Sequence, residues 1–321
     1  TSATGFIADY GGTGWVNTNF RGNYKIDNGA HTLSYGLHYD QNNYNYLLTY
    51  GYNWSTANSL ATKHTIARGS SKTSAIWLQD FWKKSDYLTL TAGIRLEEWK
   101  AYDGYNYAST GAYSNQTSQS ATGASPKLSA MIDGPNNWLT TASLARTTRF
   151  PTLTELYGMT NCLTTVSTCA DTAYKTTATA NLDPEIITSA ELSFEKSELL
   201  RTVRVTLFGE SVKDAILQQY GKLYPSVNPN GLYQYWQNTE KVHAYGIELA
   251  GKLKNAGTDG LDLSGQVIRV WSAIDESSSV GSTGKSVVGN PITYVSPWRA
   301  TVISTFRPDG NIVYSIAGRY Q

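Results

Sequence analysis

The dominant pattern along this chain is a regular alternation of apolar and polar side chains. Residues 88–96 place Leu, Leu, Ala, Ile and Leu at every second position, with Thr, Thr, Gly and Arg between them. The same alternation recurs over 33–39, 203–207 and 245–249. Because successive side chains of a strand point to opposite faces, each of these segments has one apolar and one polar face. The pattern predicts β-strands that separate two different media.

The segments between the predicted strands fall into two classes that alternate along the chain. Short connections are rich in Gly, Pro, Asn and Asp, which supply the backbone angles of tight hairpins; they lie at 27–29, 83–86, 133–136, 196–200, 255–260 and 307–310. Long polar connections lie at 46–72, 102–124, 150–186, 218–238 and 275–296. This order predicts successive hairpins and about twelve antiparallel strands, with every long connection at one end of the sheet.

Short turns at one end and long loops at the other are typical of a transmembrane β-barrel, whose turns are periplasmic and whose loops are extracellular. No apolar run approaches the roughly 18 residues of a transmembrane helix, but a barrel strand needs only about 10 residues. A large soluble all-β domain is the alternative. Since lipid cannot satisfy an open sheet edge, the strands must either close among themselves or pair with strands outside this sequence.

Composition adds three expectations about partners and compartment. The 26 Lys and Arg nearly balance the 25 Asp and Glu, which argues against nucleic acid as a partner. The 23 Tyr and 9 Trp have rings with a polar tip, which suit contact with outer-membrane lipid or with a ligand. Cys162 and Cys169 lie close together in a polar stretch, which predicts a loop disulfide in an oxidising compartment, with two free thiols as the alternative.

Several short motifs follow one another in a fixed order. They are LQDFW (78–82) with LTLTAGIR (88–95), SPKL (125–128), RFPT (149–152), ELYG (155–158), NLDPE (181–185) with Glu191 and Leu192, and Asn238 with YGIEL (245–249). Their order and spacing over about residues 75–320 resemble the barrel portion of the TonB-dependent outer-membrane receptors. The set is more specific than any single motif in it.

The resemblance implies a 22-stranded barrel that encloses an N-terminal plug, and the plug of that family carries the segment that engages TonB. Neither the plug nor that segment is recognisable here. We therefore expect residues 1–321 to be a partial barrel domain, with the plug absent and terminal strands missing. The resemblance also implies the outer membrane of a Gram-negative bacterium and TonB as a partner that acts through the plug.

No sequence motif indicates catalysis or a resident cofactor. The stretch VGSTGKS (280–286) lacks the first glycine of a phosphate-binding loop, because residue 279 is Ser, and no helical pattern follows it. The four histidines are dispersed, and none lies near the cysteine pair in a metal-ligand spacing. We therefore expect no enzyme activity, no cofactor and no metal site.

Two sets of residues are candidates for contact with a ligand. The first is the polar face of the strands, which is predicted to line the lumen as a self-paired wall or to contact a plug or an anionic ligand; it contains Arg21, Lys25, Asp40, Arg95, Glu97, Arg204 and Glu210. The second is the aromatic content of the long loops, which can stack on a flat ligand or on lipid headgroups; it contains Tyr102, Tyr105, Tyr107, Tyr233, Tyr235 and Trp236.

Three functional hypotheses follow. The family resemblance implies an energised importer of a scarce nutrient, foremost a ferric siderophore or another metal chelate. A passive porin or an adhesin-type barrel would share the strand pattern but not the coupling to energy. A soluble carbohydrate-binding β protein is the third hypothesis, based on the Tyr and Trp content.

Overall fold

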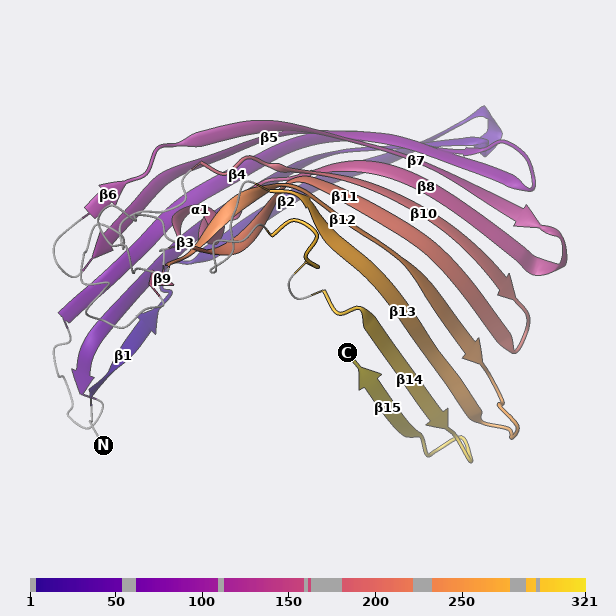
Figure 1. Ribbon diagram of the computed structural model, residues 1–321. Coiled ribbons are helices and arrows are strands. Elements are labelled where there is room, and N and C mark those ends of the chain that lie inside the picture. Colours follow the sequence, from indigo (N-terminus) through magenta and orange to yellow (C-terminus); the bar gives the residue numbers. More distant parts are fainter. Residues whose placement is uncertain are drawn as a thin grey trace.

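The computed structural model describes residues 4–53, 62–108, 113–158, 161–162, 181–221, 233–277, 287–292 and 295–321. These residues form one antiparallel sheet that curves into an arch (Figure 1). Its strands are β1 (Thr4–Asp9), β2 (Gly14–Ile26), β3 (His31–Asn53), β4 (Thr62–Lys83), β5 (Leu88–Ala108), β6 (Tyr113–Asn115), β7 (Gln119–Gly134), β8 (Trp138–Arg149), β9 (Asn161–Cys162), β10 (Glu185–Ser197), β11 (Arg201–Gly221), β12 (Tyr233–Leu253), β13 (Leu261–Glu276), β14 (Trp298–Phe306) and β15 (Tyr314–Tyr320).

The wall is a series of hairpins, each joining two neighbouring strands at the same end of the sheet. The pairs are β2–β3, β4–β5, β7–β8, β10–β11, β12–β13 and β14–β15. All their turns lie at one end of the arch, while the strand ends that flank the long connections lie at the other (Figure 1). Two turns are short 3₁₀ segments, η1 (Asp27–Gly29) and η2 (Pro135–Asn137), in which Asn28 and Asn136 take the positive φ that such turns need. The predicted hairpins, and the asymmetry between their two ends, are confirmed.

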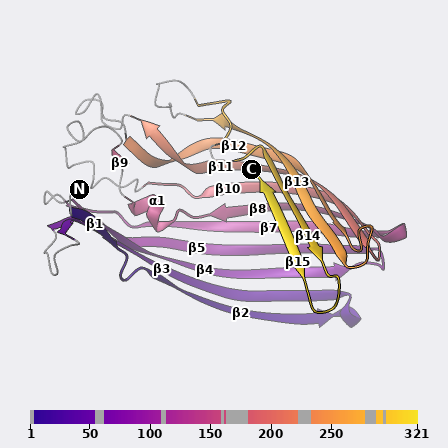
Figure 2. The same ribbon diagram turned by 90° about the horizontal axis from the view of Figure 1, so that it is seen from below.

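The arch has two open edges among the described residues. β2 pairs only with β3, and β15 pairs only with β14. Figure 2 shows the strands side by side from β2 to β12, seen from below. The strands of this chain therefore do not close among themselves within the part that the structure describes.

The apolar rows lie on an exposed face of the sheet, which we call the outer face. Ile76 and Leu78 of β4 are 57% and 50% exposed, and Leu96 of β5 is 48% exposed. A continuous row of large apolar side chains is stable only against another apolar medium, because its exposure to water costs free energy. The row from Leu88 to Leu96 is thus no dry core, and the prediction of an outward apolar face is confirmed. The opposite face is called the inner face below.

The strands run further toward the long connections than the sequence pattern predicts. Residues 46–72 are expected to be a loop, yet β3 continues to Asn53 and β4 begins at Thr62. β5 likewise continues to Ala108, β11 to Gly221, and β12 begins at Tyr233. Polar and apolar side chains occur on both faces of these extensions, as at the consecutive Leu47 and Leu48, so the alternation disappears although the backbone ladder continues. The predicted boundaries of these loops are wrong for that reason.

The one α-helix of the described residues is α1 (Leu153–Tyr157), a short segment at the long-connection end. It packs against β3, β4 and β5. No described helix has both the length and the apolar character needed to cross a membrane.

Candidate functional site

The strand register places the seven predicted lumen residues on the inner face. Paired residues of antiparallel strands share a face, and Phe20 pairs with the outward Leu37, so Arg21 points inward. The same alternation places Lys25, Asp40, Arg95, Glu97, Arg204 and Glu210 opposite the apolar rows. Part of this wall is self-paired. The guanidinium Nε of Arg95 lies 2.8 Å from Glu97 Oε1, and Arg204 Nη2 lies 3.7 Å from Glu248 Oε1.

The three tyrosines of the β5 extension point to the outer face. Tyr105 pairs with Arg68 and Tyr107 pairs with Ile66, both of which lie on the outer row of β4. The guanidinium carbon of Arg68 lies 4.7 Å from the centre of the Tyr105 ring. Tyr102 pairs with Ser70 on the same row. Tyr102, Tyr105 and Tyr107 thus face away from the interior.

The second aromatic group is divided between the two faces of β12. Trp236 packs against the apolar cluster on the inner face described below. Tyr235, which precedes Trp236 in the strand, is half-buried, and this burial raises the pKa of its phenol. Tyr233 lies in β12, but its side chain is outside the described residues. Cys162 forms part of β9 and Cys169 lies outside the described residues, as does the predicted disulfide between them.

A short helix turns inward where the chain leaves β8. Thr152 precedes α1 and accepts a hydrogen bond at Oγ1 from the Glu155 backbone N–H, at 3.3 Å. The Glu155 carboxylate in turn accepts from the Thr152 backbone N–H, at 2.7 Å. This reciprocal capping box satisfies two N–H groups that a helix start leaves without partners. Five helical residues are too few for stability on their own, so tertiary contacts must hold α1 in place.

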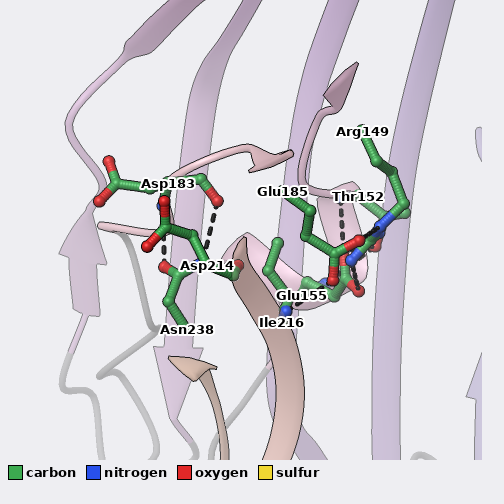
Figure 3. Close-up of polar contacts among 8 residues, drawn as sticks. All are labelled: Arg149, Thr152, Glu155, Asp183, Glu185, Asp214, Ile216 and Asn238. Atoms are coloured by element: carbon green, nitrogen blue, oxygen red, sulfur yellow. Dashed lines mark hydrogen bonds and ion pairs between the residues drawn. The ribbon is translucent and has the colours of Figure 1, made fainter. Parts of the chain in front are cut away.

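Arg149, the last residue of β8, links α1 to the first residue of β10 (Figure 3). Its Nη1 and Nη2 each donate to one Glu155 carboxylate oxygen, at 3.1 Å, and its Nε donates to Glu185, the first residue of β10. Glu185 also accepts from the backbone N–H of Ile216 in β11, at 2.6 Å. Both carboxylates are buried. A single guanidinium therefore connects residues that stand before and after the long connection, in the planar fork geometry that carboxylates fit best.

Asn238 of β12 makes a second connection beside the first (Figure 3). Its Nδ2 donates to the Asp183 carbonyl oxygen at 2.9 Å and to the Asp214 carbonyl oxygen at 2.6 Å. Its Oδ1 accepts from the Asp183 backbone N–H at 2.9 Å. Asp214 has a φ of 57°, which leaves its carbonyl outside the regular ladder. The amide of Asn238 thus ties the residues before β10 to an irregularity in β11.

We expect Asn238→Ala to loosen residues 181–185 without disturbing the wall. The change removes the hydrogen bonds to the N–H and carbonyl of Asp183 and to the carbonyl of Asp214; because Asp183 is exposed and water can replace the amide, the cost is about 0.5–1.5 kcal/mol. The rate of hydrogen exchange of the 181–185 backbone should increase by the factor that corresponds to this free energy. Asn23→Ala, on the exposed edge strand β2, is the control and should stay within about 0.5 kcal/mol. Equal exchange in the two variants would contradict this role of Asn238.

Tyr157 packs against the inner face of β4 and β5. It is fully buried, and its carbonyl accepts from Asn106 Nδ2 at 2.8 Å. The ring lies against Gly69 and Gly104, where an added Cβ would come within 2.3 Å of Cδ2 and 2.4 Å of Cε1. Burial, and secondarily the charge of Asp103, raises the pKa of its phenol to about 12. The two glycines thus create the space that this ring occupies.

An apolar cluster surrounds this ring on the inner face. Trp99 of β5 stacks on Phe150, with ring centres 5.5 Å apart. The buried members come from β5, α1, the residues before β10 and β11; they are Trp99, Ala101, Leu153, Leu156, Tyr157, Leu182 and Ile216. Burial of these side chains supplies the tertiary stabilisation that α1 lacks by itself. We call the residues 149–158 and 181–185, held together in this way, the anchored segment.

Sequence reasoning assigned no role to the polar residues of the anchored segment, although its motifs contain them. Arg149, Thr152 and Glu155 stand in the RFPT and ELYG motifs, and Glu185 stands in NLDPE. One local signal was present: Thr152 and Glu155 have the spacing of a capping box directly before an apolar residue. The partnership of Arg149 with Glu185 has no such signal, because it depends on the return of the chain to the sheet.

The arrangement fixes the two ends of the connection between β8 and β10 against the inner face. The carboxylates of Glu155 and Glu185 are both engaged by Arg149, and the Tyr157 phenol is buried. Ionic groups that are fully paired in this way serve to fix geometry. The site is therefore a structural base for the connection between β8 and β10.

Comparison with known proteins identifies the family by one family model and the fold by several solved structures. Residues 1–321 match the family model described as TonB dependent receptor-like, beta-barrel. No curated protein matches the chain. Among solved structures, the copper transporter OprC is similar with a TM-score of 0.68 at 14% identity, over 95% of this chain and 43% of that one.

Two further structures come from named organisms. The ferric yersiniabactin uptake receptor FyuA from Yersinia pestis has a TM-score of 0.65 at 15% identity, over 99% of this chain and 43% of that one. The siderophore receptor PiuA from Acinetobacter baumannii has a TM-score of 0.67 at 13% identity, over 97% and 46%. The chain therefore spans less than half the length of these relatives. From its family match, this chain belongs to the TonB-dependent receptor β-barrels, which lie in the outer membrane of Gram-negative bacteria.

Proposed function

We propose that this chain is the wall of an outer-membrane receptor for TonB-dependent uptake of a metal chelate, foremost a ferric siderophore. Family membership supports uptake as the general activity. The printed names of the relatives support the substrate class, since they include a ferric yersiniabactin receptor, a siderophore receptor and a copper transporter. At 13–15% identity these relatives support the fold, so the substrate class is an analogy.

The observation that carries the proposal is the anchored segment. Arg149 and Asn238 fix both ends of the connection between β8 and β10 against the inner face. A loop whose ends are fixed in this way loses less conformational entropy when it binds a ligand. We propose that it helps to form the entrance at which the chelate binds. Trp236 borders the same cluster and is the aromatic candidate that this proposal retains for ligand contact.

The rest of the mechanism is proposed by analogy with the family. The strands of this chain would be part of a 22-stranded barrel that encloses a plug, and TonB would act on that plug from the periplasm. The barrel wall would remain rigid while the plug rearranges. The share of each relative that this chain covers supports a partial barrel. The soluble carbohydrate-binding hypothesis is not retained, because this family lies in the outer membrane.

Uptake by whole cells separates the proposal from a passive channel. Cells that produce the protein are offered iron-55 bound to a hydroxamate, a catecholate or a phenolate siderophore, one at a time. We expect one class to accumulate, and only in cells with an intact TonB system. Equal accumulation without TonB would establish a passive channel instead. No accumulation of any of the three would contradict the ferric siderophore as substrate.

A further inference from the structure

Two consecutive residues of β11 are buried in two different apolar clusters. Ile216 is 4% exposed and belongs to the cluster around Tyr157. Ala215 is 2% exposed and belongs to a second cluster, which it forms with Val242 of β12 and Ile274 of β13. Because successive side chains of a strand point to opposite faces, both faces of β11 are covered at this level. This part of β11 therefore lies between two packed layers.

The second layer contains residues 287–292, which we call the strap. The strap belongs to the connection between β13 and β14 and lies against the edge of β13. The backbone N–H of Gly289 donates to the Ile274 carbonyl oxygen at 2.8 Å, and the N–H of Ile274 donates to the Asn290 carbonyl oxygen at 3.0 Å. The regular pairing of β14 with β13 ends at Arg269. The strap thus continues the hydrogen bonding of β13 beyond the end of β14.

A tight turn shapes the strap, and two apolar side chains hold it in place. The N–H of Asn290 donates to the Val287 carbonyl oxygen at 3.1 Å. Between them, Gly289 has a φ of 85°, a left-handed conformation that glycine adopts without steric cost. The side chains of Val287 and Ile292 pack against the cluster that contains Ala215. This second cluster therefore joins the strap to β11.

The anchored segment fixes the backbone of β11 through polar contacts (Figure 3). Glu185 accepts from the N–H of Ile216 at 2.6 Å. Asn238 Nδ2 donates to the carbonyl oxygens of Asp183 and Asp214, at 2.9 and 2.6 Å. Asp214 has a φ of 57°, a strained conformation that a residue other than glycine keeps only where its surroundings hold it. The path of the β11 backbone at this level thus depends on the anchored segment.

Ala215 connects these two sets of contacts, because it stands between the strained Asp214 and the hydrogen-bonded Ile216. Release of either neighbour would change the direction of its side chain. The second cluster is packed around that side chain, and a packed cluster does not absorb such a shift by gradual deformation. Displacement of the anchored segment should therefore loosen the strap, and displacement of the strap should loosen the anchored segment.

We propose that the anchored segment and the strap form one coupled unit, in which residues 214–216 of β11 transmit a displacement of either segment to the other. Both segments belong to long connections, which are extracellular in this class of barrel. Such a coupling is reciprocal, so a ligand that orders one connection also orders the other. The inference holds for any ligand and does not rest on the chelate proposed above.

Hydrogen exchange of the full-length protein in detergent micelles tests the coupling from both ends. Arg149→Ala acts on the anchored segment, because Arg149 binds Glu155 and Glu185. Gly289→Ala acts on the strap, because alanine rarely adopts the φ of 85° at this position. Exchange is measured by mass spectrometry for residues 181–185, for the strap and, as a reference for the wall, for residues 88–96.

Each variant has a matched control. Arg146→Ala removes an exposed arginine from the same strand as Arg149. Gly257→Ala changes a glycine that also has a positive φ, of 79°, and also has no atom within 4 Å of an added Cβ. Gly257 lies in the turn between β12 and β13, at the opposite end of the sheet from the strap.

We expect Arg149→Ala to accelerate exchange of the strap at least about fivefold, and Gly289→Ala to accelerate exchange of residues 181–185 by a similar factor. Residues 88–96 should stay unchanged, and both controls should stay within about twofold of the wild type. If Arg149→Ala leaves residues 181–185 protected, Gly289→Ala decides alone. If the turn tolerates alanine, Ile292→Ala takes its place, because it removes an apolar side chain of the strap.

Two results would overturn the proposal. The first is acceleration confined to the segment that carries the substitution, because β11 would then transmit nothing. The second is an equal acceleration of residues 88–96, because the substitution would then loosen the whole wall.

Discussion

Replacement of Arg149 by Ala should release the anchored segment from the inner wall. The change leaves the buried carboxylates of Glu155 and Glu185 without their cation, and loss of one partner from such a network costs about 3–5 kcal/mol. Because the wall is held by its own backbone ladder, we expect the loss to be local. Hydrogen exchange of residues 150–158 and 181–185 should accelerate by roughly two orders of magnitude or more, while β3 and β4 keep their protection.

Two other variants test whether the effect depends on the bridge that Arg149 forms between the two glutamates. Arg149→Lys keeps the charge but cannot donate to both glutamates in the planar fork, so it should recover only part of the protection. Arg146→Ala removes an exposed arginine of the same strand and should change exchange little. Arg149→Ala with wild-type protection at residues 150–158 would show that the apolar cluster alone holds the segment.

Gly69→Ala should displace Tyr157 and detach α1. The added methyl group would lie 2.3 Å from the ring, and a ring between two rigid strands cannot yield by so much without leaving its place. Overpacking of this kind costs typically about 1–3 kcal/mol. Faster hydrogen exchange of residues 153–158 is the expected result. Gly104→Ala should have the same effect from the other side of the ring, because its Cβ would lie 2.4 Å away.

A matched glycine and a double variant separate this clash from a general effect of glycine loss. Gly209→Ala in β11 adds a methyl group with 3.8 Å to its nearest neighbour, and should leave exchange unchanged or slightly slower. Tyr157→Ala removes the ring, so Gly69→Ala should then cost almost nothing further. Additive effects of Gly69→Ala and Tyr157→Ala would contradict direct contact as the cause.

The strands and hairpins of the wall could be predicted from the sequence because the signals for them lie within short stretches of the chain. Alternation over 88–96 identifies both faces of β5, and the Gly, Asn and Asp turns identify the hairpins. The parts of β3, β4 and β5 nearest the long connections could not be predicted in the same way, because polar and apolar side chains no longer alternate there. Their strand character comes from pairing with neighbours that are themselves extended.

The orientation of the loop aromatics depends on an irregularity that the sequence does not reveal. β5 has one more residue than β4 between the pairs Ser70–Tyr102 and Arg68–Tyr105, and Asp103 there has a φ of 56°. This bulge keeps Tyr102 and Tyr105 on one face although they are three residues apart. It also turns Asn106 inward to the Tyr157 carbonyl. Simple alternation would have placed Tyr102 and Tyr105 on opposite faces.

The anchored segment shows where sequence reasoning stops. Its capping box can be recognised from the spacing of Thr152 and Glu155, but a helix of five residues is too short to show a hydrophobic periodicity. The contacts that hold it join Arg149 to Glu185 and Asp183 to Asn238 across the long connection. Such pairs can be recognised only once the sheet has brought β8, β10, β11 and β12 together.

The most direct test of the account asks on which side of the wall lipid lies. Single cysteines at Ile94 and Thr91 are labelled with a nitroxide, in a protein whose own two cysteines are replaced by serine, and studied by electron paramagnetic resonance in native outer membranes. We expect the label at position 94 to collide with dissolved oxygen and not with a polar nickel chelate, because the outer face borders hydrocarbon. The label at position 91 should show the reverse preference. A label at position 94 that neither reagent reaches would place this row in a protein core and contradict the account.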